Sequence, residues 1–239
     1  MNSLTTRDTW CSAATVLALG RASFVADPMG ALYWPEERLL AVADLHLEKG
    51  SAFAARRVFL PPYDTATTLA ALAVLVARYA PRGVLALGDS FHDVSGGERL
   101  AAQDRATLSR LQSGRDWIWV AGNHDPVLPA DLGGARHAEI AIGGIMFRHR
   151  PEAEGEAEIA GHFHPMARVA GTVGSVRRRC FVSNGARCVL PAFGAYAGGL
   201  NLRDRAFAAL FGPGGAAVFA HVLGRERVYR VAQEQCLPD

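Results

Sequence analysis

Three short apolar runs, each followed at once by polar residues able to do chemistry, constrain the fold of this chain most. Each run has the length of a strand buried on both faces, and helix-type patterns lie between them. The runs are Leu39–Ala43 before Asp44, Val84–Leu87 before Gly88-Asp89, and Trp117–Ala121 before Gly122-Asn123-His124-Asp125. The order strand, helix, strand, helix, strand predicts a parallel sheet with right-handed crossovers.

The two intervening helices have recognisable apolar stripes. In the first, Asp64 can cap the helix and Pro81 marks its end. Its stripe consists of Leu69, Leu72, Val76 and Tyr79. The second predicted helix is Glu98–Leu111, and its apolar side consists of Leu100, Leu108 and Leu111. Both helices are expected to pack one face on the parallel sheet.

The second half of the chain has a different pattern, with short β-type runs separated by glycines and little helix. These runs are Ile140–His149, Glu158–His162, Arg179–Ser183, Arg187–Phe193 and Ala216–Leu223. They predict a second, largely antiparallel sheet packed against the first. Because no linker or repeat divides the sequence, we expect residues 1–239 to form one domain. The predicted fold is α/β, a two-sheet β-sandwich of mixed sheets flanked by helices.

Composition narrows the class of protein further. The chain is 50% hydrophobic and 20% charged, as in soluble globular proteins. Its net charge of +2 is too small to indicate a polyanion-binding protein. Its longest apolar run, Leu69–Ala77, falls well short of the ~18 residues that span a bilayer. Cys11–Gly20 is expected to be the first strand rather than a signal core, because Asp8 precedes it and no convincing cleavage site follows.

Cysteine usage agrees with a cytoplasmic protein. The four cysteines include no C-x-x-C pair, which argues against a Cys-ligated zinc site. A reducing compartment without disulfides is the simpler interpretation.

The polar residues at the strand ends favour a metal site. Ligands of open α/β sheets collect beyond the carboxyl ends of the strands, where Asp44, Asp89 and Asn123 are expected. Asp44-x-His46 can direct a carboxylate and an imidazole to one point, and Asp89 can bridge two cations. Six of the eight histidines lie in such blocks: His46, His92, His124, His149, His162 and His164.

Each of these motifs is ordinary by itself, since a single D-x-H or G-D is frequent in turns. Their joint order is not ordinary: D-x-H, G-D, G-N-H-D, H and G-H-x-H follow predicted strands one after another. Oxygen and imidazole ligands without thiolate suit two divalent ions of the Mn, Fe, Co or Zn kind.

This motif set, from Asp44 to His164, resembles that of the calcineurin-like metallophosphoesterase superfamily, whose two-sheet sandwich agrees with the predicted fold. The resemblance implies two metal sites that share one carboxylate. One would consist of Asp44, His46, Asp89 and His164, and the other of Asp89, Asn123, His149 and His162. His124 would then be a catalytic histidine rather than a ligand.

Further strings resemble the DNA ligase-associated branch of that superfamily. They are Ala31-Leu-Tyr-Trp-Pro35, Asp44-Leu-His-Leu-Glu-Lys-Gly50, Leu60-Pro-Pro-Tyr-Asp64, Gly88-Asp-Ser-Phe-His-Asp93, Arg115-Asp-Trp-Ile-Trp119 and Leu190-Pro-Ala-Phe-Gly-Ala-Tyr196. That branch is bacterial and accompanies repair genes for a DNA ligase, a helicase and a nuclease-like protein. It implies a manganese-type phosphodiesterase acting on DNA, an endonuclease with some preference for single strands, with those three proteins as partners.

Two rival functions remain open at this point. One is a small phosphodiester hydrolase or a pyrophosphatase resembling the lipid A precursor pyrophosphatases, although no amphipathic lid is visible. The other is a non-catalytic scaffold that docks a ligase or helicase. Such scaffolds tend to lose ligands or the catalytic histidine, and this chain retains them, which favours an enzyme.

Supporting roles can be assigned to residues around these motifs. Asp125 could orient His124 and favour its protonated form, or be a turn aspartate. His92 resembles a substrate-side histidine of the nuclease members, with a loop residue bonded to Asp93 as the alternative.

Nucleic-acid contacts are the third kind of supporting role. Arg177, Arg178 and Arg179 could contact backbone phosphates, or protect a solvated edge strand. Aromatic residues such as Phe53 and Tyr63 could stack on bases, but most aromatics are expected in the core and none is assigned to DNA.

Overall fold

A seven-stranded mixed sheet forms from the first half of the chain. The computed structural model describes residues 15–153, 155, 157–212 and 216–239. The strands are β1 (Thr15–Leu19), β2 (Ala22–Ala26), β3 (Leu32–Trp34), β4 (Leu39–Ala43), β5 (Gly83–Leu87), β6 (Asp116–Val120) and β7 (Ala135–His137), in that spatial order. β4, β5 and β6 run parallel, as the sequence predicts, and β7 adds a fourth parallel strand that was not predicted. β1 to β4 form antiparallel neighbours.

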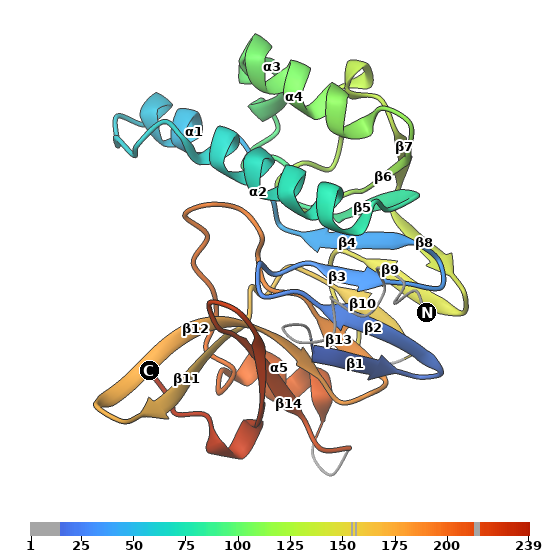
Figure 1. The fold of residues 1–239 in the computed structure, drawn as a ribbon. Coiled ribbons are helices and arrows are strands. Elements are labelled where there is room, and N and C mark those ends of the chain that lie inside the picture. Colours follow the sequence, from blue (N-terminus) through green and yellow to red (C-terminus); the bar gives the residue numbers. More distant parts are fainter. Residues whose placement is uncertain (1–14, 154, 156, 213–215) are drawn as a thin grey trace, which may run out of the picture.

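The second half forms a second mixed sheet (Figure 1). Its strands are β8 (Glu139–Ile142), β9 (Ile145–Arg148), β10 (Glu158–Ala160), β11 (Met166–Gly171), β12 (Gly174–Ser183), β13 (Arg187–Val189), β14 (Phe219–Leu223) and β15 (Val228–Ala232). Their order is β15-β14-β12-β13-β10-β9-β8, with β11 paired to β12. Only β10 pairs in parallel, with β9 and with β13, so the prediction of a largely antiparallel sheet is confirmed for the described strands.

Helices cover the outer faces of both sheets, which confirms the predicted order helix, sheet, sheet, helix (Figure 1). They are α1 (Lys49–Ala55), α2 (Asp64–Tyr79), α3 (Gly96–Arg99), α4 (Ala102–Gln112) and α5 (Arg205–Phe211). The first four lie on the first sheet, and α5 packs on the second through Phe207 and Leu210.

The alternation of side chains along β4 explains how the layers pack. Leu40 and Val42 join Leu72 of α2 in the core between helices and first sheet. Leu39 and Ala41 point the other way and join Phe147 of β9 in the core between the sheets. A strand buried on both faces needs apolar residues at every position, which is why these runs are continuous.

Three local predictions are wrong, for identifiable reasons. The predicted helix Glu98–Leu111 is two helices, because Leu100 and Ala101 have extended ψ values of 117° and 146°. This break lets Leu100 reach the core. Asp64 does not cap α2; its carboxylate accepts the Gly50 amide hydrogen at 3.1 Å. Ile140–His149 is a hairpin, not one strand, because Gly143 and the glycine after it take positive φ.

Other boundaries differ less. The expected first strand Cys11–Gly20 is described only from Thr15, and residues 11–14 lie outside the described residues. The strand expected at Arg187–Phe193 ends at Val189, and the chain then runs as a long loop to Leu200. Cys180, Cys188 and Cys236 are buried free thiols, while Cys11 is not described. Among the described helices, none is long and apolar enough to cross a membrane.

A buried histidine far from the predicted motifs makes stability depend on pH. Burial lowers the pKa of His221 on β14 to about 4, and nearby Arg230 adds to this. Because the unfolded chain takes up a proton near pH 6.5, stability falls as pH drops from about 6.5 towards 4. Between pH 7 and pH 5 the free energy of unfolding should therefore fall in both proteins. We expect the fall to be about 2 kcal/mol smaller in His221→Leu than in the unsubstituted protein. Urea unfolding at the two pH values measures this difference; equal losses would contradict it.

Candidate metal centre

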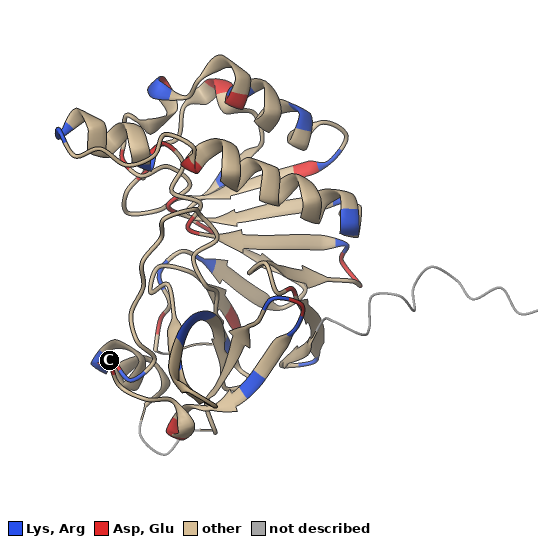
Figure 2. Ribbon diagram, turned by 60° about the vertical axis from the view of Figure 1, so that its left-hand side comes forward, with Lys and Arg blue, Asp and Glu red and all other residues tan. Residues whose placement is uncertain are grey.

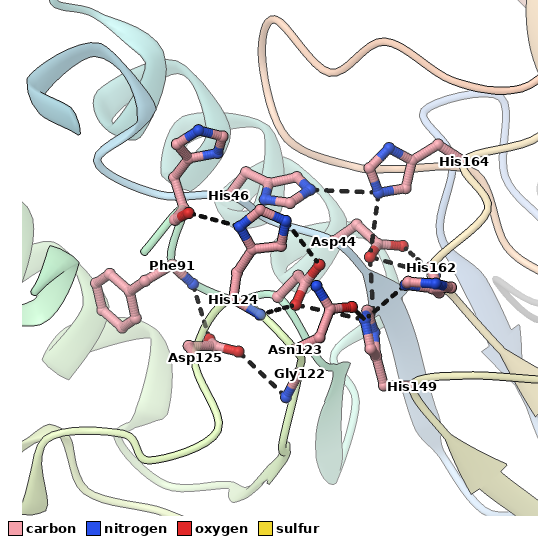
Figure 3. A network of polar contacts seen from close by, with 12 residues as sticks. Asp44, His46, Phe91, Gly122, Asn123, His124, Asp125, His149, His162 and His164 are labelled. Carbon is pink, nitrogen blue, oxygen red and sulfur yellow. Dashed lines mark hydrogen bonds and ion pairs between the residues drawn. The ribbon is translucent and has the colours of Figure 1, made fainter. Parts of the chain in front are cut away.

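The loops that follow β4, β5, β6, β9 and β10 bring the predicted site residues to one place (Figure 3). Figure 2 shows acidic positions gathered where the central strands of the first sheet end. The carboxylate and imidazole ligands that follow β4, β5, β9 and β10 form two groups, each with ligand atoms within 4.8 Å of one another.

The first group consists of Asp44, His46 and His164. His164 Nε2 lies 3.2 Å from Asp44 Oδ1 and 3.2 Å from His46 Nε2. Asp44 is fully buried, and its carboxylate also accepts the backbone N–H of His162 at 3.0 Å. The carboxylate therefore sits at the junction of this group with the second.

The second group consists of Asp89, His149 and His162. His149 Nε2 lies 3.3 Å from Asp89 Oδ1 and 3.2 Å from His162 Nδ1. Asn123 Oδ1 approaches the same nitrogen at 3.0 Å. All seven residues expected as metal ligands are thus brought together.

The chemistry of the donor atoms fits cations. His164 Nδ1 faces the carbonyl of Gly198 at 3.2 Å, and His149 Nδ1 faces that of Leu87 at 3.1 Å. With Nδ1–H donated to a carbonyl, each Nε2 presents a lone pair towards carboxylate oxygens that also carry only lone pairs. Such a convergence of acceptors is balanced by positive charge at its centre, and the residues present therefore fit two divalent ions.

Backbone strain is concentrated at the same residues. Five of the seven expected ligands have positive φ: Asp44 (54°), His46 (44°), Asp89 (44°), His162 (73°) and His164 (47°). Non-glycine residues rarely adopt this conformation, and it persists only where the surroundings enforce it. The strained turns aim side chains from separate loops at one point.

Glycines let the chain approach the carboxylates closely. A Cβ on Gly122 would lie 2.1 Å from Asp89 N and 2.2 Å from Asp89 Oδ1. A Cβ on Gly161 would lie 2.7 Å from Asp44 Oδ2. Both positions therefore have no room for a side chain.

We expect Gly122→Ala to reduce metal affinity by at least about tenfold, because the methyl group must displace the Asp89 carboxylate. Gly171→Ala is the matched control, since the nearest atom to its Cβ, a backbone oxygen, would be 3.6 Å away. Isothermal titration of metal-stripped protein with Mn²⁺ measures the change. Unaltered affinity in Gly122→Ala would show that the contact is not needed.

Electrostatics set the protonation of the ligands. Burial lowers the pKa of His46 to about 3 and that of His162 to about 4, with neighbouring histidines adding to both. Burial opposes ionisation of Asp89, but the hydrogen bond and charge of His149 hold its pKa below the ordinary value. A neutral imidazole and an ionised carboxylate are the forms that bind metal ions.

His124 stands beside the second group with one ring nitrogen free to act. Its backbone N–H donates to Asp89 Oδ1 at 2.9 Å, and its Nδ1 faces the carbonyl of His92 at 2.8 Å. Nε2 lies 3.9 Å from Asp89 Oδ2, and the side chain is 40% exposed. His124 can thus exchange a proton with a bound molecule through Nε2 while Nδ1 is held.

The orienting role predicted for Asp125 is wrong, because the carbonyl of His92 takes that place. The Asp125 carboxylate instead accepts the N–H groups of Phe91 and Gly122 at 2.9 and 3.1 Å. Burial raises its pKa to about 7, although the hydrogen bond from Phe91 N–H lowers it. Asp125 therefore fixes the backbone that carries the site, as in the turn interpretation.

The alternative interpretation of His92, a loop residue bonded to Asp93, does not hold. Asp93 pairs with Arg99 at 2.8 Å rather than with His92. The His92 ring stacks on His124 with centroids 5.4 Å apart and lies 5.4 Å from the ring of Phe53. Burial lowers its pKa, and the charges of Lys49 and then His124 lower it further. Its position at the rim is compatible with the predicted substrate-side role.

The three arginines lie on the β11–β12 hairpin rather than among the ligands. Arg179 donates to the carbonyl of Ala192 at 2.8 Å and is partly buried under the loop 190–200. Arg177 is exposed, donates to Gly199 O at 2.7 Å and pairs with Asp239. Arg178 is exposed. The edge-strand interpretation agrees with the structure, since residues 174–179 pair with β11 on one side and β14 pairs only with residues 180–183. Phosphate contact stays a prediction.

The sequence motifs did not reveal the role of the loop 190–200. Gly194 N donates to Asp44 O at 3.1 Å, Ala195 N to Thr68 Oγ1 at 3.0 Å, and Gly198 O faces His164. Lys49, the only lysine of the chain, donates to Tyr196 O at 2.8 Å. Backbone carbonyls leave no signature in a sequence, but the glycines of residues 190–200 could have indicated a loop that approaches the site closely.

Comparison with known proteins agrees with this architecture. No family model matches the chain, and no curated protein matches its sequence. Among solved structures, a nuclease MPE from Pseudomonas putida is 24% identical, with a TM-score of 0.71 over 91% of this chain and 100% of that chain. Yfce, a phosphoesterase from E. coli, is 13% identical, with a TM-score of 0.37 over 81% of this chain and 98% of that one. The chain thus has the fold of the Pseudomonas nuclease, and the two-sheet sandwich implied by the metallophosphoesterase resemblance is confirmed.

Proposed function

We propose that this protein is a metal-dependent phosphodiesterase that hydrolyses DNA. The observation that carries the proposal is the pair of ligand groups that meet at Asp44 and Asp89, with His124 beside them. The likeness in fold to a nuclease supports it, as does the motif order in the sequence. A scaffold would not need to keep seven ligands, five of them with strained backbone, and an accessible histidine together.

Asp44, His46, Asp89 and His164 would hold one ion, and Asp89, Asn123, His149 and His162 the other. When bound, the pair would neutralise the charge of the phosphate and lower the pKa of an attacking water. Mn²⁺ is the proposed metal, because the mixed carboxylate, amide and imidazole donors suit it, with Fe, Co and Zn as alternatives.

A residue of the protein would supply the proton that the leaving group needs. A DNA strand departs as an alkoxide, which must gain a proton. His124 Nε2 is the candidate donor, since Nδ1 is fixed against the carbonyl of His92 and the side chain is 40% exposed. The glycines at 122 and 161 keep the two carboxylates in position while this happens.

We further propose cleavage within single strands, in the bacterial cytoplasm, together with the ligase, helicase and nuclease-like proteins of a repair gene group. The branch-specific strings of the sequence support this finer proposal. Each ligand group includes one partly exposed histidine, His162 or His164, which supports access for a substrate.

A circular single-stranded DNA tests the activity, because only an endonuclease can linearise it. Metal-stripped protein should cut the circle after Mn²⁺ is added and not before. Hydrolysis of bis(p-nitrophenyl) phosphate without any cutting of the circle would move the function to a small phosphodiester or pyrophosphate substrate. Failure on both substrates would contradict the proposed function.

A further inference from the structure

The loop between α1 and α2 carries an exposed set of arginine and aromatic side chains. Residues 56–63, here named the platform loop, have the sequence Arg-Arg-Val-Phe-Leu-Pro-Pro-Tyr. Phe59 is 84% exposed and Tyr63 is 66% exposed, whereas most phenylalanines of the described chain are buried. Large apolar side chains held in water in this way mark a contact surface.

Hydrogen bonds hold the end of the platform loop to the segment that follows His46. Gly50 N donates to Asp64 Oδ2 at 3.1 Å, which joins the start of α1 to the start of α2. Glu48, two residues after the ligand His46, accepts from Thr65 Oγ1 at 3.0 Å. The platform loop therefore has a fixed position relative to the turn that carries His46.

A short path of cationic and aromatic side chains connects the centre with the platform loop. The ring of Phe53 lies 5.4 Å from that of His92, and Lys49 Nζ lies 5.8 Å from the same phenylalanine ring. The seven residues of α1 rise about 10 Å, the length of about three stacked nucleotides. In Figure 1, α1 projects beyond the ends of the strands of the first sheet, so a single strand of nucleic acid can follow the helix outwards.

The charge of the platform loop fits a polyanion. Its two charged residues, Arg56 and Arg57, are both positive and exposed. Within the described part of the chain, no carboxylate pairs with either guanidinium group. Arginines that alternate with exposed rings are typical of surfaces that bind single-stranded nucleic acid, where phosphates meet charge and bases meet aromatic faces.

We propose that the platform loop binds single-stranded DNA beside the metal centre, with Phe59 and Tyr63 stacked on bases and Arg56 and Arg57 at phosphates. This inference rests on the proposed phosphodiesterase function and gives it a substrate-binding surface. The bases of a duplex are stacked on each other and offer no free face, so the platform loop selects single strands. Pro61 and Pro62 restrict the loop, which reduces the entropy lost on binding.

Fluorescence anisotropy of the Mn²⁺-loaded full chain with labelled oligo(dT) tests the proposal. Phosphorothioate linkages keep the probe from being cut during the measurement. We expect Phe59→Ala to weaken binding at least about fivefold. Replacement of both Arg56 and Arg57 by alanine should lower the slope of log K against log salt by about 1.4, since each phosphate contact of a single strand contributes ~0.7.

Matched controls are Tyr229→Ala, a 47% exposed ring on β15, and Arg110→Ala, an exposed arginine on α4. Both should bind oligo(dT) like the unsubstituted protein. An annealed dA·dT duplex should be bound equally by Phe59→Ala and the unsubstituted protein. Thermal unfolding confirms that each variant is folded.

The outcomes separate the inference from the proposed function. Unchanged affinity and salt slope in the platform variants would overturn the inference, as would equal weakening on oligo(dT) and duplex. A change of oligomeric state in Phe59→Ala with oligo(dT) binding intact would show instead that the platform loop contacts protein. If the unsubstituted protein cuts circular single-stranded DNA but the platform variants bind oligo(dT) unchanged, only the inference fails. If it hydrolyses neither that circle nor bis(p-nitrophenyl) phosphate, the proposed function itself fails.

Discussion

Asp89→Asn is expected to lower phosphodiesterase activity at least about 10³-fold and to leave fewer than two bound ions. The Asp89 carboxylate is the one expected to belong to both metal sites. Its Oδ1 lies 3.3 Å from His149 Nε2 and 2.9 Å from the N–H of His124 that it accepts, and its Oδ2 faces the His124 ring. The amide has the same shape as the carboxylate but no charge, so the loss of activity reports what the charge contributes. A 10³-fold loss corresponds to about 4 kcal/mol of activation free energy.

Asp93→Asn is the matched control for this experiment. Asp93 lies in the same loop but pairs with Arg99 and holds Ser95 N, away from the ligand groups. Metal content by plasma mass spectrometry and hydrolysis of bis(p-nitrophenyl) phosphate should both stay near the unsubstituted level in this variant. Two bound ions and full activity in Asp89→Asn would show that the carboxylate is not shared.

His124→Ala is expected to separate two kinds of leaving group. On DNA, where an alkoxide departs, the rate should fall about 10²- to 10⁴-fold, the usual contribution of a positioned acid. On bis(p-nitrophenyl) phosphate the fall should be smaller, because the nitrophenolate leaves without a proton. Metal content should remain at two ions, since His124 Nε2 is 3.9 Å from Asp89 and lies outside both ligand groups.

His137→Ala provides the control for His124→Ala, because His137 is exposed on β7 and joins β6 through its backbone. Single-turnover rates on both substrates measure the effect. An equal fall on the two substrates would assign His124 to binding of the phosphate rather than to protonation. Loss of metal would assign it to the ligands.

The parallel strands β4 and β5 could be predicted because both faces of each strand are buried, and the sequence is apolar at every position of such a strand. At β4 every residue is buried, Leu40 against helices and Leu39 against the second sheet, and only a continuous apolar run allows this. The inner strands β2 and β3 gave no such signal, since they are short and follow turns. The break at Leu100 was also invisible, because Leu100, Leu108 and Leu111 keep helical spacing and all become buried.

The ligand residues could be predicted from chemistry and order, while their supporting contacts could not. Carboxylates and imidazoles at strand ends are visible in the sequence, and the structure brings all seven together. The carbonyls of Leu87, His92 and Gly198 that hold the imidazoles depend on long-range approach of loops. For this reason the sequence points to Asp125, the neighbour of His124, rather than to a carbonyl 32 residues away.

Titration of metal-stripped protein with Mn²⁺, with bound ions and phosphodiesterase activity followed together, tests the central claim most directly. The two ligand groups predict two bound ions per chain and activity that rises only as the second site fills. One ion at saturation, or full activity in the stripped protein, would contradict a binuclear phosphodiesterase.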